Sequence, residues 1–307
     1  MPGERILEFL STGLYISQSQ GFLVVKDRSK ELDRVPLDDI FSLIVSGTGQ
    51  TISTNLLSNL NELKIPVVFC SNKYLPSGLL LPTQGNHLYH QRLKSQIALS
   101  TPVKKKLWQK IVKSKLLNQS FLLDRFDIEG NDIAKMAERV RSGDPDNLEA
   151  QGARKYWVLL FGNDFRRNRC LEGENTLLNF GYTILRSAVA RSLVASGLNP
   201  GIGIHHDNQN NHFCLVDDMI EPFRPFIDEG VKLLSTRNLL NLSQVSRRVL
   251  TESIHSDVLF EGQITSVRNT IERCCKILVH CFEDSKMNLE FPNFDPNGVL
   301  KNVNFGL

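Results

Sequence analysis

The hydrophobic pattern of this 307-residue chain changes near residue 85, and that change constrains the fold more than any other feature. Before it, short runs rich in Val, Ile, Leu and Phe are bounded by Gly, Ser, Asp and Pro, as in β-strands. The runs lie at 5–10, 13–18, 21–27, 31–37, 40–47, 65–71 and 77–83. The first part of the chain is therefore predicted to be a small β domain.

One segment of this strand-rich part, residues 51–64, has a different period. Its leucines recur at helical spacing, and either Thr51 or Ser53 can cap its first turn. The sequence SGTGQTIS at 46–53, which leads into it, hints at a phosphate-binding loop but lacks the lysine of that motif. A turn that enters a capped amphipathic helix explains these residues better.

Beyond residue 85 the apolar residues recur every three to four positions, as in amphipathic helices. The periodic segments are 87–100, 104–126, 131–143, 149–162 and 175–197. Gly197 suits the residue after the last of these helices, and Pro200 prevents its continuation. Strands followed by helices predict an α+β fold, with a β-sandwich-like domain over 1–84 and a larger all-α domain over 85–290. Residues 291–307 form a loop-like tail that we expect to be poorly ordered.

Composition places the chain among ordinary globular proteins, with 41% apolar and 22% charged residues and a formal net charge of +3. That charge is too small to argue for nucleic acid without a local cluster. The six cysteines form no C-x-x-C pair, and they are expected to be reduced thiols in a cytoplasmic protein. No signal-peptide pattern and no apolar window of about 18 to 20 residues is present, so no membrane association is expected.

Metal-capable side chains are concentrated in the segment GIHHDNQNNHFCLVDDMIEPFRP at 203–225. Asp218 and Glu221 are three positions apart and share a face if this part is helical, and the residues around them are apolar. Two carboxylates in apolar surroundings repel each other and resist desolvation, and a bound cation removes both penalties. Because Pro222 lacks an N–H, the helix is expected to end before it or to kink there.

The pair His205 and His206 precedes these carboxylates across a loop rich in Asn and Gln that can fold back on the helix. Two carboxylates and one imidazole suit Mg²⁺ or Mn²⁺ better than zinc. A second interpretation pairs His205 and Asp207 with a distant His255 or His280, as in non-haem iron oxygenases, although those sites normally lie in β-barrels. The simplest alternative is a set of ordinary surface side chains.

Positive charge is clustered in the segment 101–120, which contains six lysines and no acid. At helical spacing one set of lysines lines one face while apolar residues turn inward. The lysines of that face are Lys106, Lys110 and Lys113. A second cluster contains Arg166 and Arg167. A lysine-rich face is often only solvated, but beside a divalent-metal site it indicates phosphodiester chemistry on nucleic acid.

The segment GLNPGIGIHHDNQNNHFCLVDDMIEPFRPFID at 197–228 resembles the core of CRISPR-associated protein one, the integrase of spacer acquisition. The HH-D-N-Q run followed by D-x-x-EPFRP-x-x-D is most similar to the type II subfamily of that family. Three further segments resemble the same family in the expected order: 47–71, 147–157 and 175–200. Most of residues 40–228 is therefore covered by the resemblance.

The resemblance implies a catalytic metal site made of Glu149, His206 and Glu221. Asp218 would be a supporting or alternate ligand, and a shift of one residue would exchange His206 for His205. Tyr156 lies on the same helix face as Glu149 and would support the site. The implied contacts to the DNA backbone are Lys104, Lys105, Lys106, Lys110, Lys113, Arg166 and Arg167.

The implied activity is that of a DNA endonuclease and integrase using Mg²⁺ or Mn²⁺. The 3′-hydroxyl of a prespacer would attack a phosphodiester of the CRISPR repeat, by transesterification. The implied partners are DNA, a second copy of the chain bound through the β domain, CRISPR-associated protein two and other type II adaptation subunits. Two alternatives remain open from the residues: a metal-dependent nuclease that hydrolyses branched or single-stranded DNA, and a non-catalytic DNA-binding scaffold.

Overall fold

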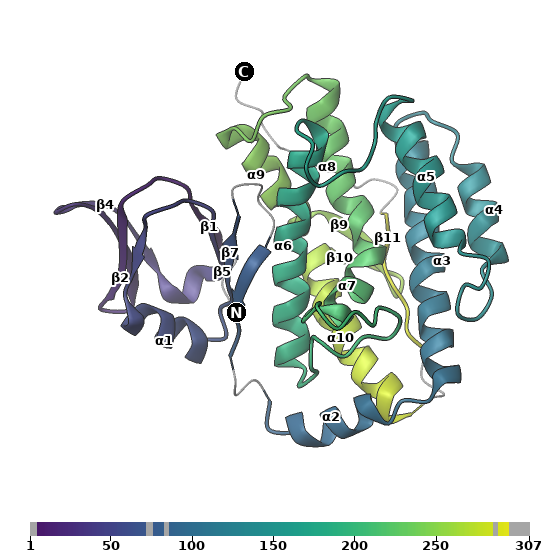
Figure 1. Ribbon diagram of the computed structural model, residues 1–307, viewed down its shortest axis with the longest axis horizontal. Coiled ribbons are helices and arrows are strands. Elements are labelled where there is room, and N and C mark those ends of the chain that lie inside the picture. Colours follow the sequence, from purple (N-terminus) through teal and green to yellow (C-terminus); the bar gives the residue numbers. More distant parts are fainter. Residues whose placement is uncertain (1–4, 72–75, 83–85, 285–287, 295–307) are drawn as a thin grey trace. The chain divides into compact units, whose positions relative to one another are not determined.

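The computed structural model describes residues 5–71, 76–82, 86–284 and 288–294. The chain divides into two compact units, Met1–His87 and Leu88–Leu307 (Figure 1). The first is rich in strands and the second is mainly helical, which confirms the predicted fold class.

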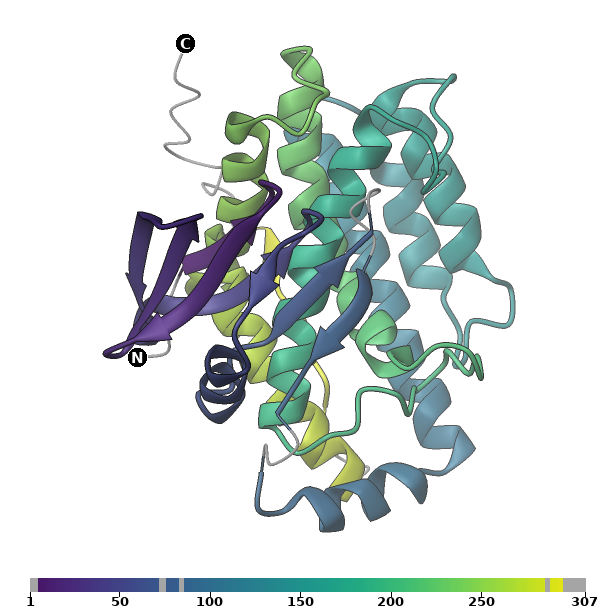
Figure 2. The ribbon, with the colours of Figure 1, turned by 60° about the vertical axis from the view of Figure 1, so that its left-hand side comes forward.

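The first unit contains two four-stranded sheets, seen from a second side in Figure 2. In one sheet, three parallel strands are followed by an antiparallel one, in the order β1 (Arg5–Phe9), β5 (Ile40–Val45), β7 (Val67–Cys70) and β8 (Pro76–Leu80). In the other sheet, two hairpins are extended by a short parallel strand, in the order β4 (Lys30–Pro36), β3 (Phe22–Asp27), β2 (Leu14–Ser19) and β6 (Thr51–Ile52). A 3-10 turn, η1 (Leu37–Asp39), joins β4 to β5.

The two sheets share one hydrophobic core with helix α1 (Thr54–Glu62). Leu56 and Leu60 of this helix are fully buried, as the leucine spacing requires. The helix is capped by Ser53, whose side chain accepts the N–H of Leu56 at 3.3 Å. The segment that hinted at a phosphate loop is thus a turn, the short strand β6 and a helix cap.

The second unit is built from helices of very different length. They are α2 (Tyr89–Ile97), α3 (Thr101–Arg125), α4 (Asn131–Arg139), α5 (Leu148–Phe161), α6 (Glu174–Ala195), α7 (Cys214–Ile220), α8 (Arg224–Thr236), α9 (Gln244–Glu252) and α10 (Val267–Glu283). Two 3-10 turns, η2 (Glu221–Phe223) and η3 (Ser253–His255), lie between them. Helix α6 is buried along most of its length, and α3, α4 and α5 pack side by side in Figure 1.

The second unit also contains a small sheet that the sequence analysis did not anticipate. It has three antiparallel strands, in the order β10 (Gln263–Ser266), β9 (Asp257–Phe260) and β11 (Asn293–Phe294). The expected all-α domain therefore carries a minor β element. Strand β11 also belongs to the segment predicted as a loop-like tail, and the rest of that tail, 295–307, lies outside the described residues.

Two chain reversals predicted from single residues position the site. Gly197 follows α6 with a φ of 70°, and the N–H of Leu198 donates to the carbonyl of Leu193 at 2.9 Å, which ends the helix. Helix α7 ends at Ile220, and Pro222 lies in the 3-10 turn η2 before α8 begins. The segment between these reversals carries His205, His206, Asp218 and Glu221, while the remaining predicted ligand, Glu149, lies on α5.

The cysteines in the described residues are all free, and four of them are buried: Cys214, Cys274, Cys275 and Cys281. Burial raises the pKa of Cys275 and Cys281, so these thiols are unreactive at neutral pH. A search of the described helices finds none with the length and apolar character needed to cross a bilayer.

Candidate active site

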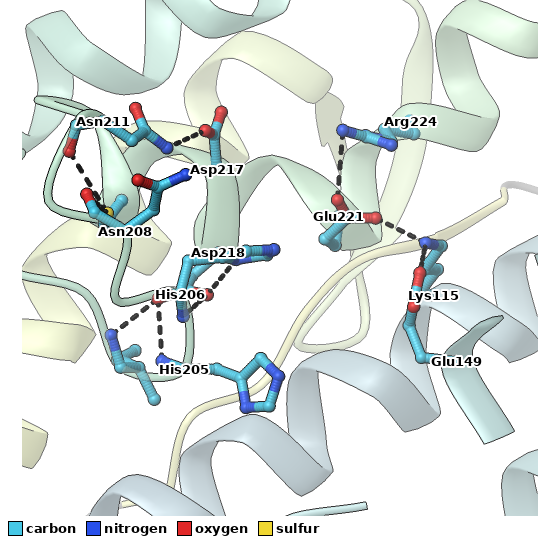
Figure 3. A network of polar contacts seen from close by, with 12 residues as sticks. Lys115, Glu149, His205, His206, Asn208, Asn211, Asp217, Asp218, Glu221 and Arg224 are labelled. Carbon is cyan, nitrogen blue, oxygen red and sulfur yellow. Dashed lines mark hydrogen bonds and ion pairs between the residues drawn. The ribbon is translucent and has the colours of Figure 1, made fainter. Parts of the chain in front are cut away.

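The structure joins two of the predicted ligands, Glu149 and Glu221, through a single lysine (Figure 3). Lys115 of α3 forms ion pairs with Glu149 Oε1 of α5 and with Glu221 Oε2 of η2, the latter at 2.5 Å. Arg224, in the first turn of α8, contacts the other oxygen of Glu221 at 3.1 Å. Four elements therefore converge on one cluster of two acids and two bases.

The cluster is largely removed from solvent, with Lys115 3% and Glu221 5% exposed. Burial by itself would raise the pKa of Glu221, but the charges of Arg224 and Lys115 outweigh it and lower the pKa below its ordinary value. Burial would likewise lower the pKa of Lys115, yet Glu221 and Glu149 raise it. Lys115 and Glu221 are therefore both charged at neutral pH.

Glu149 is placed by a cap on the N-terminus of α5. The carboxylate of Asp144 accepts the N–H groups of Leu148 and Glu149, each at 2.9 Å, which satisfies two donors of the first turn. Asn147, between them, has a left-handed φ of 52°. The Glu149 side chain is 25% exposed, so it lies where the buried cluster meets solvent.

His206 is held by Asp218, the second acid of the sequence pattern. The fully buried Asp218 carboxylate accepts the backbone N–H groups of Ile204, His205 and His206 at 2.6, 3.0 and 3.1 Å. It also lies 2.7 Å from His206 Nδ1, and this hydrogen bond raises the pKa of His206. A carboxylate on Nδ1 fixes the tautomer that leaves Nε2 available as a ligand.

The loop that carries the histidines approaches Asp218 so closely that only glycine fits at position 203. A Cβ on Gly203 would lie 2.2 Å from the carbonyl oxygen of His206 and 3.0 Å from Asp218 Oδ2. The Gly in the G-I-H-H pattern is therefore a steric requirement of the Asp218 contacts.

His205 has a different environment from its neighbour. Its ring stacks on Trp108 of α3, with a centroid distance of 4.0 Å and an interplanar angle of 2°. Burial lowers the pKa of His205, so its ring is neutral at pH 7. These contacts favour His206, rather than His205, as the histidine that serves a metal.

Tyr156 is fully buried, and its hydroxyl donates to Asp228 Oδ2 of α8 at 2.8 Å. Tyr182 of α6 donates to the other oxygen of the same carboxylate. Burial raises the pKa of Asp228 to about 6, although both tyrosine hydrogen bonds lower it. Tyr156 therefore connects α5 to α8, and its hydroxyl is engaged there.

The predicted DNA-contacting lysines lie along the first half of α3. Lys105 and Lys106 are exposed, and Lys104, Lys110 and Lys113 are partly buried. Lys110 Nζ donates to Asn288 Oδ1, so this lysine has a protein partner. Lys105 and Lys106 are the more available part of the predicted basic face.

The two arginines of the second basic cluster contact the protein itself. Arg166 Nη1 donates to the carbonyls of Asn163 and Phe165, at 2.5 and 2.8 Å. Arg167 donates to the side-chain amides of Asn175 and Asn179, each at 2.9 Å. Arg167 is therefore an anchor of its loop on α6, while Arg166 is exposed at the surface.

The chemistry of the donor set fits a divalent cation with hard ligands: two carboxylates and an imidazole whose Nδ1 is already bound. The side chains as they stand do not enclose an ion, because no three His, Cys, Asp or Glu residues in the described ranges have the required arrangement. The same finding gives no support to the iron-type set built on His205 and Asp207. Lys115 lies between the two carboxylates, which explains why they do not form a preformed cage.

Sequence reasoning missed Lys115, Arg224 and Trp108 as members of this site. A signal for Lys115 was present, because it lies four positions after Ile111 on the apolar face of α3. A lysine in an apolar stripe requires a buried anion. Arg224 lies in the EPFRP run but was given no role there, and Trp108 carried no comparable signal in the residue pattern.

Comparison with known proteins assigns the chain to a family. The family model for CRISPR associated protein Cas1 matches residues 9–257. The chain belongs to the Cas1 family. The CRISPR-associated endonuclease Cas1 of Neisseria meningitidis is 38% identical over 250 residues, which cover 79% of this chain and 81% of the relative. A CRISPR-associated endonuclease Cas1 of Pyrobaculum aerophilum is 30% identical over 234 residues, covering 70% and 77%.

Solved structures agree with this fold. A casposase bound to integration product has a TM-score of 0.79 at 18% identity and covers 97% of this chain and 95% of its own. A Cas1 protein from Thermotoga maritima has a TM-score of 0.72 at 16% identity, covering 95% and 100%. At these sequence identities the structural likeness shows that the chain has the Cas1 fold. The chemistry of the site is inferred from its own residues.

Proposed function

We propose that this Cas1 protein is a divalent-metal-dependent DNA integrase and endonuclease of CRISPR adaptation, of the type II subfamily. It would join the 3′-hydroxyl ends of a prespacer to the CRISPR repeat. The observation that carries the proposal is the convergence of Glu149 and Glu221 on one cluster, with His206 held by Asp218.

The proposed reaction exchanges one phosphodiester for another. The 3′ oxygen of the prespacer bonds to phosphorus, the bond to a 3′ oxygen of the repeat strand breaks, and a proton passes from the attacking to the leaving oxygen. Mg²⁺ or Mn²⁺, when bound, would polarise the phosphate and acidify the attacking hydroxyl. Glu149, Glu221 and His206 would hold it.

The remaining residues of the site, Asp218 and Arg224, would orient the side chains that hold the metal. Asp218 keeps the His206 ring in one tautomer and orientation and ties the loop backbone to α7. Arg224 binds Glu221 Oε1, which leaves the other oxygen directed toward Lys115 and Glu149. No covalent enzyme intermediate is needed, so a nucleophilic side chain is not required.

Contacts to the DNA backbone are proposed for the lysines of α3, Lys104, Lys105, Lys106, Lys110 and Lys113, and for Arg166. The proposed partners are a second copy bound through the β unit, Cas2 and other type II adaptation subunits, in the cytoplasm. The fold is shared with a Cas6-RT-Cas1–Cas2 complex at a TM-score of 0.73 and 19% identity, covering 92% of this chain and 35% of that one. That complex contains Cas2, and the casposase is bound to an integration product, which supports Cas2 and DNA as partners.

The test is integration of an end-labelled prespacer into a repeat-bearing plasmid, with Mn²⁺ or Mg²⁺ and Cas2 supplied. Glu149→Gln, His206→Ala and Glu221→Gln should each abolish label transfer. His205→Phe keeps the ring that stacks on Trp108 but has no nitrogen, so it should retain transfer. Loss of transfer in His205→Phe with retention in His206→Ala would reverse the assignment of the two histidines.

Other outcomes of the same assay separate the alternatives. Cleavage of plasmid or prespacer without joining would favour a nuclease that uses water. Transfer that survives all the ligand changes would place the active site elsewhere. A wild type that binds DNA but neither joins nor cleaves it, and whose melting temperature Mn²⁺ does not raise, would indicate a scaffold.

A further inference from the structure

Lys115 is a buried cation that the proposed chemistry does not use. It lies on α3, is 3% exposed, and is flanked by the fully buried Leu116 and, one turn earlier, Ile111. Its Nζ is directed at the carboxylates of Glu149 and Glu221, and Figure 3 shows it between them. A lysine in this position is desolvated, so it is retained only with anionic partners.

Most carboxylate oxygens around Lys115 already contact a cation, so few are available to a second one. Glu221 gives one oxygen to Arg224 and the other to Lys115, at 3.1 and 2.5 Å. Glu149 gives Oε1 to Lys115. Two carboxylates this close repel each other, and the ammonium group relieves that repulsion. Lys115 therefore does for this pair of acids what a metal ion would do.

We propose that Lys115 is an internal counter-ion that competes with the divalent metal for Glu149 and Glu221. The inference rests on the proposed function, because it takes these carboxylates as metal ligands. An ammonium group and a divalent ion cannot share the same oxygens without strong repulsion at short distance. Metal binding then requires Nζ to leave at least one carboxylate. Lys115 keeps the two acids paired before the metal binds and weakens the affinity of the site for it.

The experiment compares Mn²⁺ binding by the full-length wild type and Lys115→Met, which keeps the length of the side chain and removes its charge. Free Mn²⁺ is followed by electron paramagnetic resonance at fixed pH and ionic strength, without DNA. We expect Lys115→Met to bind Mn²⁺ at least about tenfold more tightly, which corresponds to about 1.4 kcal/mol. Its melting temperature without metal should fall, and the increase produced by Mn²⁺ should exceed that of the wild type.

Lys232→Met is the control, because Lys232 is partly buried and donates to the carbonyl of Leu160, at 2.6 Å, rather than to a carboxylate. It should lower the melting temperature and leave Mn²⁺ affinity unchanged. If Lys115→Met does not fold without Mn²⁺, Lys115→Gln carries the same test, since its amide can hydrogen-bond the carboxylates without charge. Equal or weaker Mn²⁺ binding by the Lys115 variant would overturn the proposal.

Glu149→Gln and Glu221→Gln distinguish two hypotheses: that Lys115 competes with the metal, and that Glu149 and Glu221 bind the metal at all. If they leave wild-type Mn²⁺ binding unaltered, the metal site itself is misplaced and the role of Lys115 is rejected with it. If they abolish Mn²⁺ binding while Lys115→Met binds no more tightly than the wild type, the metal site stands and only the competition is rejected.

Discussion

Glu221 and Asp228 are buried carboxylates on consecutive elements, η2 and α8, and their partners are opposite in kind. Glu221 is held by the cations Lys115 and Arg224. Asp228 is held by the neutral hydroxyls of Tyr156 and Tyr182. Burial raises the pKa of Asp228 to about 6, whereas the cations lower the pKa of Glu221 despite equal burial.

Because their partners differ in kind, the contacts of Glu221 can be exchanged for a bound cation, whereas the contacts of Asp228 are fixed. A cation on Glu221 can be replaced by another cation without leaving the carboxylate unpaired. The tyrosine hydroxyls on Asp228 have no such substitute, because losing the carboxylate would leave two buried donors unsatisfied. The Asp228 cluster therefore suits the attachment of α5 and α6 to α8, and the Glu221 cluster suits a binding site. Arg224, 4.9 Å above the Tyr182 ring, lies between the two.

The largest expected effect is the loss of charge at Glu221. Glu221→Gln leaves the buried Lys115 and the partly buried Arg224 with one fewer anion, so we expect the free energy of unfolding to fall by about 3 kcal/mol. Asp228→Asn should lower it by only about 1 kcal/mol, because the amide still accepts a hydroxyl and the direct partners of Asp228 are neutral. Urea unfolding of both variants at pH 7 measures the difference. Equal losses would mean that the two clusters do not differ in this way.

A double variant sharpens the same comparison. Lys115→Met combined with Glu221→Gln removes a cation and its anion together. The combined loss should be smaller than the sum of the two single losses if the pair is coupled as the contact indicates. A strictly additive result would remove the evidence for coupling.

The pH dependence of stability should show the second largest effect. The pKa of Asp228 is raised to about 6, so the folded protein keeps a proton that the unfolded chain releases. The free energy of unfolding should therefore fall as the pH rises toward 6, by about 2 kcal/mol from this group. Asp228→Asn cannot ionise and should lack this part of the decline. Urea unfolding of both proteins between pH 4 and 6 tests it, and parallel curves would contradict it.

Much of the fold could be predicted because its signals are local. The leucines of α1, Gly197 after α6 and Pro222 in η2 each act through their own backbone or face, so the residue types determine the outcome. Strand β11 could not be predicted in this way. It has two residues, and it exists through pairing with β9, which is distant in the sequence.

The site was predictable where a motif concentrated its residues and not where a long-range contact completed it. Asp218 and His206 lie within one short segment, and their contact follows from the fold of that loop. The role of Lys115 depends on α3 and α5 packing side by side, which no spacing encodes. Its position on the apolar face of α3 indicated burial but not which carboxylates it would meet.

A smaller effect is expected from the hydroxyls of the fixed cluster. Tyr182→Phe removes one donor to Asp228 and keeps the ring beneath Arg224, so unfolding should become about 1 kcal/mol easier. Tyr156→Phe removes the other donor and should have a similar effect. Neither should change Mn²⁺ affinity if the two clusters are independent. A change in Mn²⁺ affinity for Tyr182→Phe alone would show that Arg224 transmits between them.

The smallest effect is expected from the solvated lysines of α3, which contrast with the buried Lys115 on the same helix. Lys106 is exposed, so Lys106→Glu should leave stability within about 0.5 kcal/mol of the wild type. If it contacts the DNA backbone, the slope of log affinity against log salt should decrease in magnitude by about 1. Lys276→Glu, at an exposed position of α10, makes the same change in net charge and is the control. Equal slopes for the two variants would assign the effect to net charge and remove Lys106 from the DNA-binding face.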